Sequence, residues 1–205
     1  MIPMEKPFVS NSSESTRMFK YDWMEPFSKV PYWVPLIIYI PVISFFLYKS
    51  ALFVTPWYFI PLLYIGGIFL WTLTEYILHR FLFHWIPKGK FGARMHFIFH
   101  GVHHDYPNDA MRLVMPPIMS VTLAVLFYFL FQFVLGGSMV FPFFSGFVTG
   151  YLFYDISHYA IHHFNFKSKF WLKLKKHHMF HHYKDGNNGF GVSSNLWDKI
   201  FRTNF

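Results

Sequence analysis

The 13 histidines of this chain are its most chemically informative residues. All of them lie between His79 and His182, in four clusters that read HRFLFH, HFIFHGVHH, HYAIHH and HHMFHH. Imidazole nitrogen is the commonest protein ligand for transition metals, and the chain has no cysteine that could offer a thiolate instead. The clusters therefore predict a metal site built from nitrogen ligands.

Helical spacing selects the histidines that can face a metal together. Residues at i, i+3 and i+4 share a helix face, so each of the two HxxHH motifs can direct three rings to one centre, with some distortion at Gly101. His158 and His162 are one helical turn apart. His79 and His84 diverge on a regular helix, so either the helix ends near Phe83 or these two rings serve different metals. The ten selected ligands are His79, His84, His100, His103, His104, His158, His162, His178, His181 and His182.

Ten imidazoles exceed the needs of one metal ion. Structural zinc is satisfied by four ligands, and catalytic zinc by three ligands and a water. Two metals would have about five nitrogens each, which favours an ion of higher coordination number with a position left for oxygen, such as iron. Zinc could occupy the same ligands in an isolated sample, since it binds nitrogen more tightly than ferrous iron does. The other three histidines, His96, His163 and His177, are expected to be hydrogen-bonded structural residues.

Two acidic residues precede predicted ligands at helical spacing. Asp155, three residues before His158, could accept the second ring N–H of that ligand, or it could be a solvated acid at the membrane interface. Glu75, four residues before His79, could orient that ring or pair with Arg80, because an unpaired acid near a membrane span is costly. Both acids are therefore candidates for orienting the ligands.

One basic residue stands out between the second and third clusters. Arg112, in RLVMPP, lies where the chain is expected to re-enter the membrane. It could hold a lipid head group, or it could be an ordinary cationic membrane anchor. Asp109, three residues earlier, could pair with it.

The composition indicates that the membrane is the solvent of this chain. Hydrophobic residues make up 54% of it and charged residues only 14%. Four segments are apolar enough to span a bilayer, at about 31–47, 57–77, 115–135 and 140–157. The predicted fold is an all-α integral membrane protein in which residues 1–30 form an N-terminal segment and residues 31–205 one domain. Residues 78–114 and 158–205 form a helical cap that holds the dimetal site.

The distribution of charge predicts the orientation of the chain. With four spans, Lys49 would be the only Lys or Arg on the outer side, so both termini and the metal site are expected to be cytoplasmic. The net charge of +8 suits anionic lipid head groups, and no nucleic-acid-binding motif accompanies it. The membrane would be the endoplasmic reticulum in a eukaryote and the inner membrane in a bacterium.

The segments around the histidines resemble the membrane-bound fatty acid hydroxylase superfamily, and are most similar to the sphingolipid fatty acid 2-hydroxylases. The similar stretches are TEYILHRFLFH, HGVHHDYPNDAMRLVMPP, GYLFYDISHYAIHH and GFGVSSNLWDKIFRT. By position, the metal ligands of the family fall on the same ten histidines. The resemblance implies O2-dependent 2-hydroxylation of the fatty acyl chain of sphingolipids, ceramides or free fatty acids.

The source of electrons is a point of departure from part of that family. Yeast and animal members carry an N-terminal haem domain, whereas residues 1–30 here are too few for one. A separate donor is therefore expected, either a small cytochrome or a ferredoxin with its reductase.

The depth of the predicted ligands agrees with the implied reaction. They lie just beyond the spans, where acyl carbon 2 of a membrane lipid lies beside its head group. Oxidation in the middle of the acyl chain would need a deep or bent tunnel.

Other functions account for parts of the pattern. Another oxidation of the same superfamily (sterol methyl oxidase, carotenoid hydroxylase or desaturase) is disfavoured by the RLVMPP and GFG segments. A metal transporter would place ligands near the bilayer midplane, where the predicted spans have no ionisable residue. A haem electron-transfer protein would show a strong Soret band in its visible spectrum.

Overall fold

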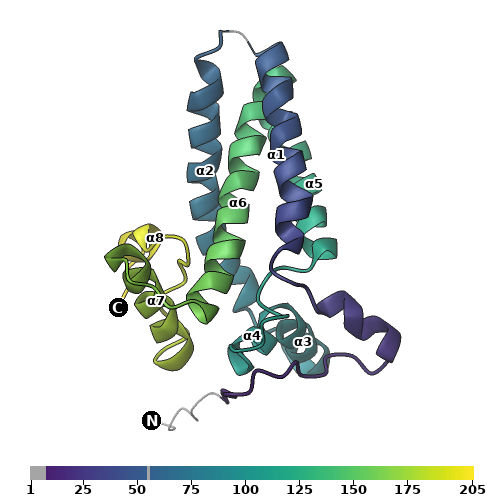
Figure 1. Ribbon diagram of the computed structural model, residues 1–205, viewed down its shortest axis with the longest axis vertical. Coiled ribbons are helices and arrows are strands. Elements are labelled where there is room, and N and C mark those ends of the chain that lie inside the picture. The colour runs from purple at the N-terminus through teal and green to yellow at the C-terminus, as the bar shows by residue number, and fades with distance from the viewer. Residues whose placement is uncertain (1–7, 55) are drawn as a thin grey trace.

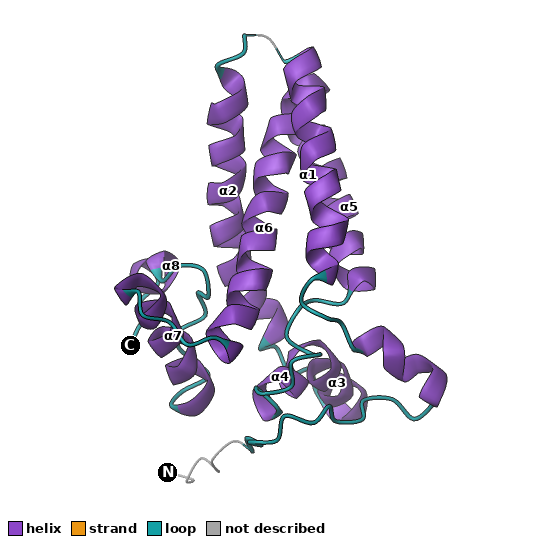
Figure 2. Ribbon diagram, viewed as in Figure 1, coloured by secondary structure: helices purple, strands orange, loops and turns teal. Residues whose placement is uncertain are grey.

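The fold is entirely helical in the part of the chain that the structure, a computed structural model, describes: residues 8–54 and 56–205. Loops join the helices, and the described residues form no strand (Figure 2). The α-helices of the described residues are α1 (Val34–Phe53), α2 (Phe59–Ile77), α3 (Gly89–His96), α4 (Val102–Asp105), α5 (Pro117–Leu135), α6 (Val140–His163), α7 (Lys169–Tyr183) and α8 (Leu196–Ile200).

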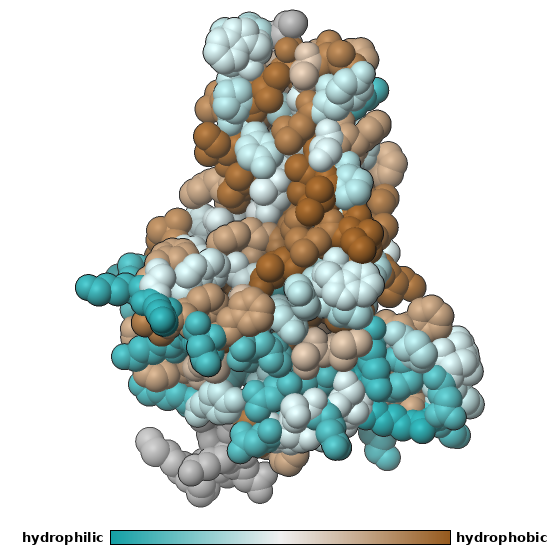
Figure 3. Space-filling model, in the orientation of Figure 1, coloured by the Kyte–Doolittle hydropathy of each residue, from teal (hydrophilic) through white to brown (hydrophobic). Residues whose placement is uncertain are grey.

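Four of these helices are long and apolar enough to cross a membrane. They are α1, α5, α2 with its continuation to Phe83, and α6 with the short turn before it. They stand side by side as a bundle above a broader cap made of the shorter helices (Figure 1). Apolar residues gather over the bundle and hydrophilic ones over the cap (Figure 3). The prediction of an all-α protein with four candidate membrane spans is therefore confirmed.

Helix α6 is the centre of the bundle. About two thirds of it, 67%, is buried inside the protein, compared with 11% for α1 and for α5. Its contact with α2 is close because glycines remove the side chains between them. A Cβ atom on Gly146 would lie 1.9 Å from the carbonyl oxygen of Tyr64, and one on Gly67 would lie 2.0 Å from that of Phe143. This contact fixes the lower ends of α2 and α6, which carry histidines into the cap.

Two segments of π-helix lie in the described residues, one at the lower end of α2 and one within the cap. Leu78–Phe83 continues α2, and Phe97–Gly101 joins α3 to α4. The distortion expected at Gly101 is thus present, as a widened turn. On the other side of the lower end of α6, helices α7 and α8 complete the cap (Figure 1).

Candidate metal centre

The ten histidines selected from the sequence converge into two groups of five. Within each group the ligand nitrogens all lie within 4.8 Å of one another. We call the first group site A; it consists of His79, His84, His100, His104 and His181. We call the second group site B; it consists of His103, His158, His162, His178 and His182.

The π-helix after α2 explains how His79 and His84 meet. The N–H of His84 bonds to the carbonyl of His79 at 3.2 Å, an i to i+5 bond that widens the turn. Five residues then complete little more than one turn, so both rings point into site A. Of the two alternatives that the sequence left open for this pair, the helix does end at Phe83, and the two rings are not divided between sites.

Each HxxHH motif is divided between the two sites. The first contributes His100 and His104 to site A and His103 to site B, while the second contributes only His181 to site A. On a helix, i+4 lies about 40° past a full turn and i+3 about 60° short of it, so the two positions diverge to opposite sides. The expectation that the three rings of one motif share a centre was therefore wrong, and the motifs link the two sites instead.

The spacing of the ring nitrogens fits a coordination number above four. Neighbouring Nε2 atoms are 3.0 Å apart in site A and 3.0 to 3.1 Å apart in site B. Around an ion with bonds of about 2.1 Å, nitrogens at right angles are about 3.0 Å apart, and tetrahedral ones about 3.4 Å. These separations match right angles, which belong to five- or six-coordinate ions.

Most of the rings are buried, and burial disfavours their charged form. Burial, with a smaller contribution from His181, lowers the pKa of His84 to about 3, and burial lowers the pKa of His181 to about 4. Burial also lowers the pKa of His100, His103 and His104 well below the ordinary range. Neutral imidazoles keep their lone pairs free. Nε2 of His103 is buried and has no hydrogen-bond partner in the described structure, which a metal ion would remedy.

Two rings of site A are held by backbone carbonyls. Nδ1 of His79 lies 2.5 Å from the carbonyl oxygen of Phe190, and Nδ1 of His181 lies 2.6 Å from that of Asn188. A carbonyl can only accept, so both Nδ1 atoms carry the proton and both Nε2 lone pairs face the site.

Neither acid contacts a ligand in the way the sequence suggested. Asp155 is buried and accepts the backbone N–H of Met115 and the O–H of Tyr151, rather than the ring N–H of His158. Glu75 does not hydrogen-bond to the ring of His79, four residues later. Its carboxylate accepts hydrogen bonds from Val192 and Ser193 instead.

The basic partner proposed for Glu75 and the role proposed for Arg112 also need correction. Arg80 donates to the hydroxyl of Tyr76 at 2.7 Å and not to Glu75. Arg112 is buried between the carboxylates of Glu25 and Asp109, which confirms its pairing with Asp109. Most of its donors are directed to the N-terminal segment, so it is not a surface anchor, and it lines the cavity described below.

The three histidines predicted to be structural lie outside both sites. His177 bonds to Asp198, whose carboxylate is fully buried, at 3.1 Å. Asp198 also accepts the N–H groups of Phe190 and Gly191, a role that the sequence reading missed. The sequence offered one indication of this role, namely that Asp198 follows the glycine-rich segment after the last histidine motif.

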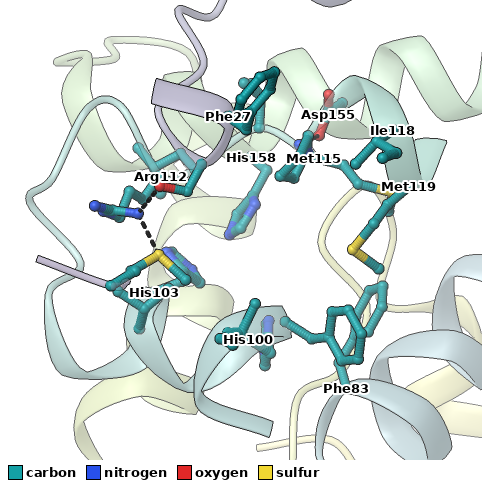
Figure 4. Close-up of a pocket in the computed structure, with 18 of the residues that line it drawn as sticks. Phe27, Phe83, His100, His103, Arg112, Met115, Ile118, Met119, Asp155 and His158 are labelled. Atoms are coloured by element: carbon teal, nitrogen blue, oxygen red, sulfur yellow. Dashed lines mark hydrogen bonds between the residues drawn. The ribbon is translucent and has the colours of Figure 1, made fainter. Parts of the chain in front are cut away.

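A cavity of about 220 Å³ opens onto both sites. His100 of site A and His103 and His158 of site B line it, as Figure 4 shows. The rest of the wall is largely apolar and comes from α5, the π-segments and the N-terminal segment; it includes Phe27, Phe83, Met115, Ile118 and Met119. An apolar cavity against two candidate metal sites is suited to a lipid chain.

Known proteins are similar to this chain in both sequence and fold. The fatty acid hydroxylase family model matches residues 64–203. The ceramide very long chain fatty acid hydroxylase scs7 of Schizosaccharomyces pombe is 39% identical over 98% of this chain and 58% of its own length. The dihydroceramide fatty acyl 2-hydroxylase FAH2 of Arabidopsis thaliana is 36% identical over 93% of this chain and 80% of its own.

A solved structure of full-length scs7p, in which only the hydroxylase domain is visible, superposes with a TM-score of 0.84 and 39% identity. The match covers 90% of this chain and 70% of that one. The chain spans little more than half the length of the scs7 relative, so the likeness concerns the hydroxylase part. Because the family model covers well over half of the chain, the protein belongs to the fatty acid hydroxylase family.

Proposed function

We propose that this protein hydroxylates carbon 2 of a fatty acyl chain, in a sphingolipid, a ceramide or a free fatty acid, with O2 as co-substrate. In this proposal the ten histidines of sites A and B hold two metal ions, iron in the active protein and zinc as an occupant of isolated samples. The relatives named as ceramide hydroxylases and dihydroceramide 2-hydroxylases support the reaction class. The observation that carries the proposal is the apolar cavity that reaches both sites.

The position of the cavity supports oxidation near the lipid head group. It lies where α5 begins, since Met115, Ile118 and Met119 all line it. Helix α5 is a candidate membrane span, so its first turn marks the interface between acyl chains and head groups. An acyl chain that enters from the bilayer would bring carbon 2, rather than its middle, to His100, His103 and His158.

The residues around the cavity would bind the chain and exclude water. Phe83 stacks on the ring of His100, with centroids 5.4 Å apart, and shields that face of site A. Val102, Leu113 and Val114 are buried in the cavity wall. Such a dry, shaped wall holds a reacting C–H bond close to the sites. Metal ions, when bound, supply the redox chemistry with O2 that side chains lack.

The remaining parts of the proposal concern topology and partners. We propose that residues 31–205 form the hydroxylase domain, that both termini and the cap face the cytoplasm, and that electrons come from a separate small cytochrome or ferredoxin with its reductase. This orientation is supported by the basic character of the cap and by Lys49, the only Lys or Arg that the predicted topology places on the outer side.

Lipid analysis of cells that express the protein tests the reaction. Wild type should raise the level of 2-hydroxy acyl chains, and His104→Ala, which removes one nitrogen of site A, should abolish the rise. His96→Ala is the matched control, because His96 lies outside both sites and its variant should behave like wild type. Unchanged 2-hydroxy acyl levels on expression of wild type, or a hydroxyl at another carbon, would refute the proposal.

A further inference from the structure

One loop near the C-terminus is bonded to two ligands of site A. Residues 188–193 follow α7, and their backbone supplies the carbonyls of Asn188 and Phe190 to His181 and His79. These two histidines lie on different helices, α7 and the π-helical end of α2. The position of this loop therefore sets the orientation of both rings.

Two buried carboxylates hold that loop by four consecutive backbone N–H groups. Asp198 accepts from Phe190 at 2.9 Å and from Gly191 at 2.8 Å. Glu75 accepts from Val192 at 2.7 Å and from Ser193 at 2.9 Å, and it also accepts the hydroxyl of Ser193. Asp198 is 0% exposed and Glu75 is 3% exposed, so water does not compete for these bonds.

The fit of the loop depends on a glycine. A Cβ atom on Gly191 would lie 2.0 Å from the carbonyl oxygen of Ser194 and 2.8 Å from Oδ2 of Asp198. Any larger residue would push the backbone away from the carboxylate. Only glycine allows this close approach.

Three rings of site B lack such support. Nδ1 of His103, His178 and His182 is buried and has no hydrogen-bond partner among the described residues. Partners of the second ring nitrogen fix the ring and raise its basicity, and their loss typically costs 10- to 100-fold in metal affinity. The two sites thus differ in what orients their ligands.

We propose that Glu75 and Asp198 are positioning residues for the metal of site A, acting through the loop 188–193 on His79 and His181. The inference rests on the metal centre of the proposed function. Without the loop, the two rings are free to rotate and site A loses affinity, whereas site B keeps its own. The two metals should therefore be released separately, and the affinity of one of them depends on a carboxylate that contacts no ligand.

Metal release from purified protein tests this without O2 or lipid. Protein loaded with zinc in detergent micelles is titrated with a chelator of known affinity, and the zinc retained per chain is measured. Glu75→Ala should release one zinc at about 10- to 100-fold lower free chelator than wild type and keep the other. Glu75→Gln should hold both as wild type does, because the amide oxygen still accepts the two N–H groups. Cobalt spectra of His181→Ala and His162→Ala show which site is lost.

Matched variants separate positioning from general damage. Glu25 also accepts two consecutive N–H groups, those of Met18 and Phe19, but it holds no ligand, so Glu25→Ala should keep both zinc ions. If Glu75→Ala does not fold, Gly191→Ala moves the same loop and should also lose the zinc of site A.

Three results would overturn the inference. They are release of both ions together from the folded Glu75→Ala and Gly191→Ala variants, wild-type retention by both of these variants, or equal loss in Glu75→Gln and Glu75→Ala. Fewer than two zinc ions on the wild type would instead refute the metal centre of the proposed function.

Discussion

Replacement of Arg112 by alanine should unfold part of the protein rather than weaken lipid binding alone. Its side chain is only 1% exposed, and its guanidinium lies 2.5 Å from Glu25 and 3.3 Å from Asp109. It also donates to the hydroxyl of Ser28 and to the carbonyl of Thr16. These contacts tie the N-terminal segment against the cavity, whose wall includes residues 18, 19, 27 and 28.

The size of the effect follows from the burial of the partners. Asp109 is as buried as Arg112, so the change would leave its carboxylate without its cationic partner and out of reach of water. Removing one partner of a buried ion pair costs about 3 to 5 kcal/mol. Glu25 is 15% exposed and partly hydrated, so Glu25→Ala should cost less than Arg112→Ala. The two changes should be coupled by about 0.5 to 3 kcal/mol because they share one interaction.

Unfolding in mixed detergent micelles measures this effect. Arg112→Ala, Glu25→Ala and the double variant are titrated with denaturing detergent, and limited proteolysis follows the release of residues 8–28. The single variants should be cleaved in this segment before the helical bundle unfolds. Arg112→Ala with wild-type stability and an intact N-terminal segment, but a raised KM for the lipid, would refute the reasoning and favour direct recognition of a head group.

Three further predictions concern the histidines and the bundle. In the unfolded chain histidine has a pKa of about 6.5, and in the folded protein His84 and His181 resist protonation to about 3 and 4. The metal-free protein should therefore be fully stable above about pH 6.5 and lose stability progressively as the pH falls toward 3; unfolding titrations that give the same stability at pH 7 and pH 4 would contradict this. Gly146→Ala should lower the free energy of unfolding by about 1 to 3 kcal/mol or more, because it forces α2 away from α6. Gly66→Ala is the control and should be tolerated, because its Cβ would lie 3.6 Å from a ring atom of Phe143. Equal unfolding midpoints for the two variants would exclude the close contact at Gly146. X-ray absorption of the loaded protein should show about five nitrogens at about 2.1 Å per metal and about half a nitrogen fewer for His104→Ala; a wild-type value of about four would indicate tetrahedral sites.

The architecture and the identity of the convergent histidines were readable from the sequence. Long runs of apolar residues are typical of membrane-spanning helices, so the four candidate spans and the all-helical fold could be predicted directly. Motif spacing selected the ten histidines that the structure brings together. Their assignment to sites could not follow from an ideal helix. A π-turn unites His79 and His84, and the angle between i+3 and i+4 separates His103 from His104.

The partners of the charged residues depended on contacts between distant parts of the chain. Glu75 bonds to residues 117 and 118 positions away, and Arg112 to a residue 87 positions away. Sequence proximity suggested nearer partners for both, because helical spacing reports only local neighbours. Only the pairing of Arg112 with Asp109, which is local, could be predicted.

Oxidation of a defined acyl lipid by the purified protein tests the proposed activity most directly. The protein is reconstituted with iron under anaerobic conditions, reduced, mixed with a ceramide or fatty acid, and exposed to ¹⁸O2. We expect two irons per chain and a 2-hydroxy product that carries one ¹⁸O atom, and we expect no such product with His104→Ala. Product oxygen derived from water, a hydroxyl or double bond elsewhere in the chain, or full activity of His104→Ala would contradict a histidine-bound metal pair that hydroxylates carbon 2.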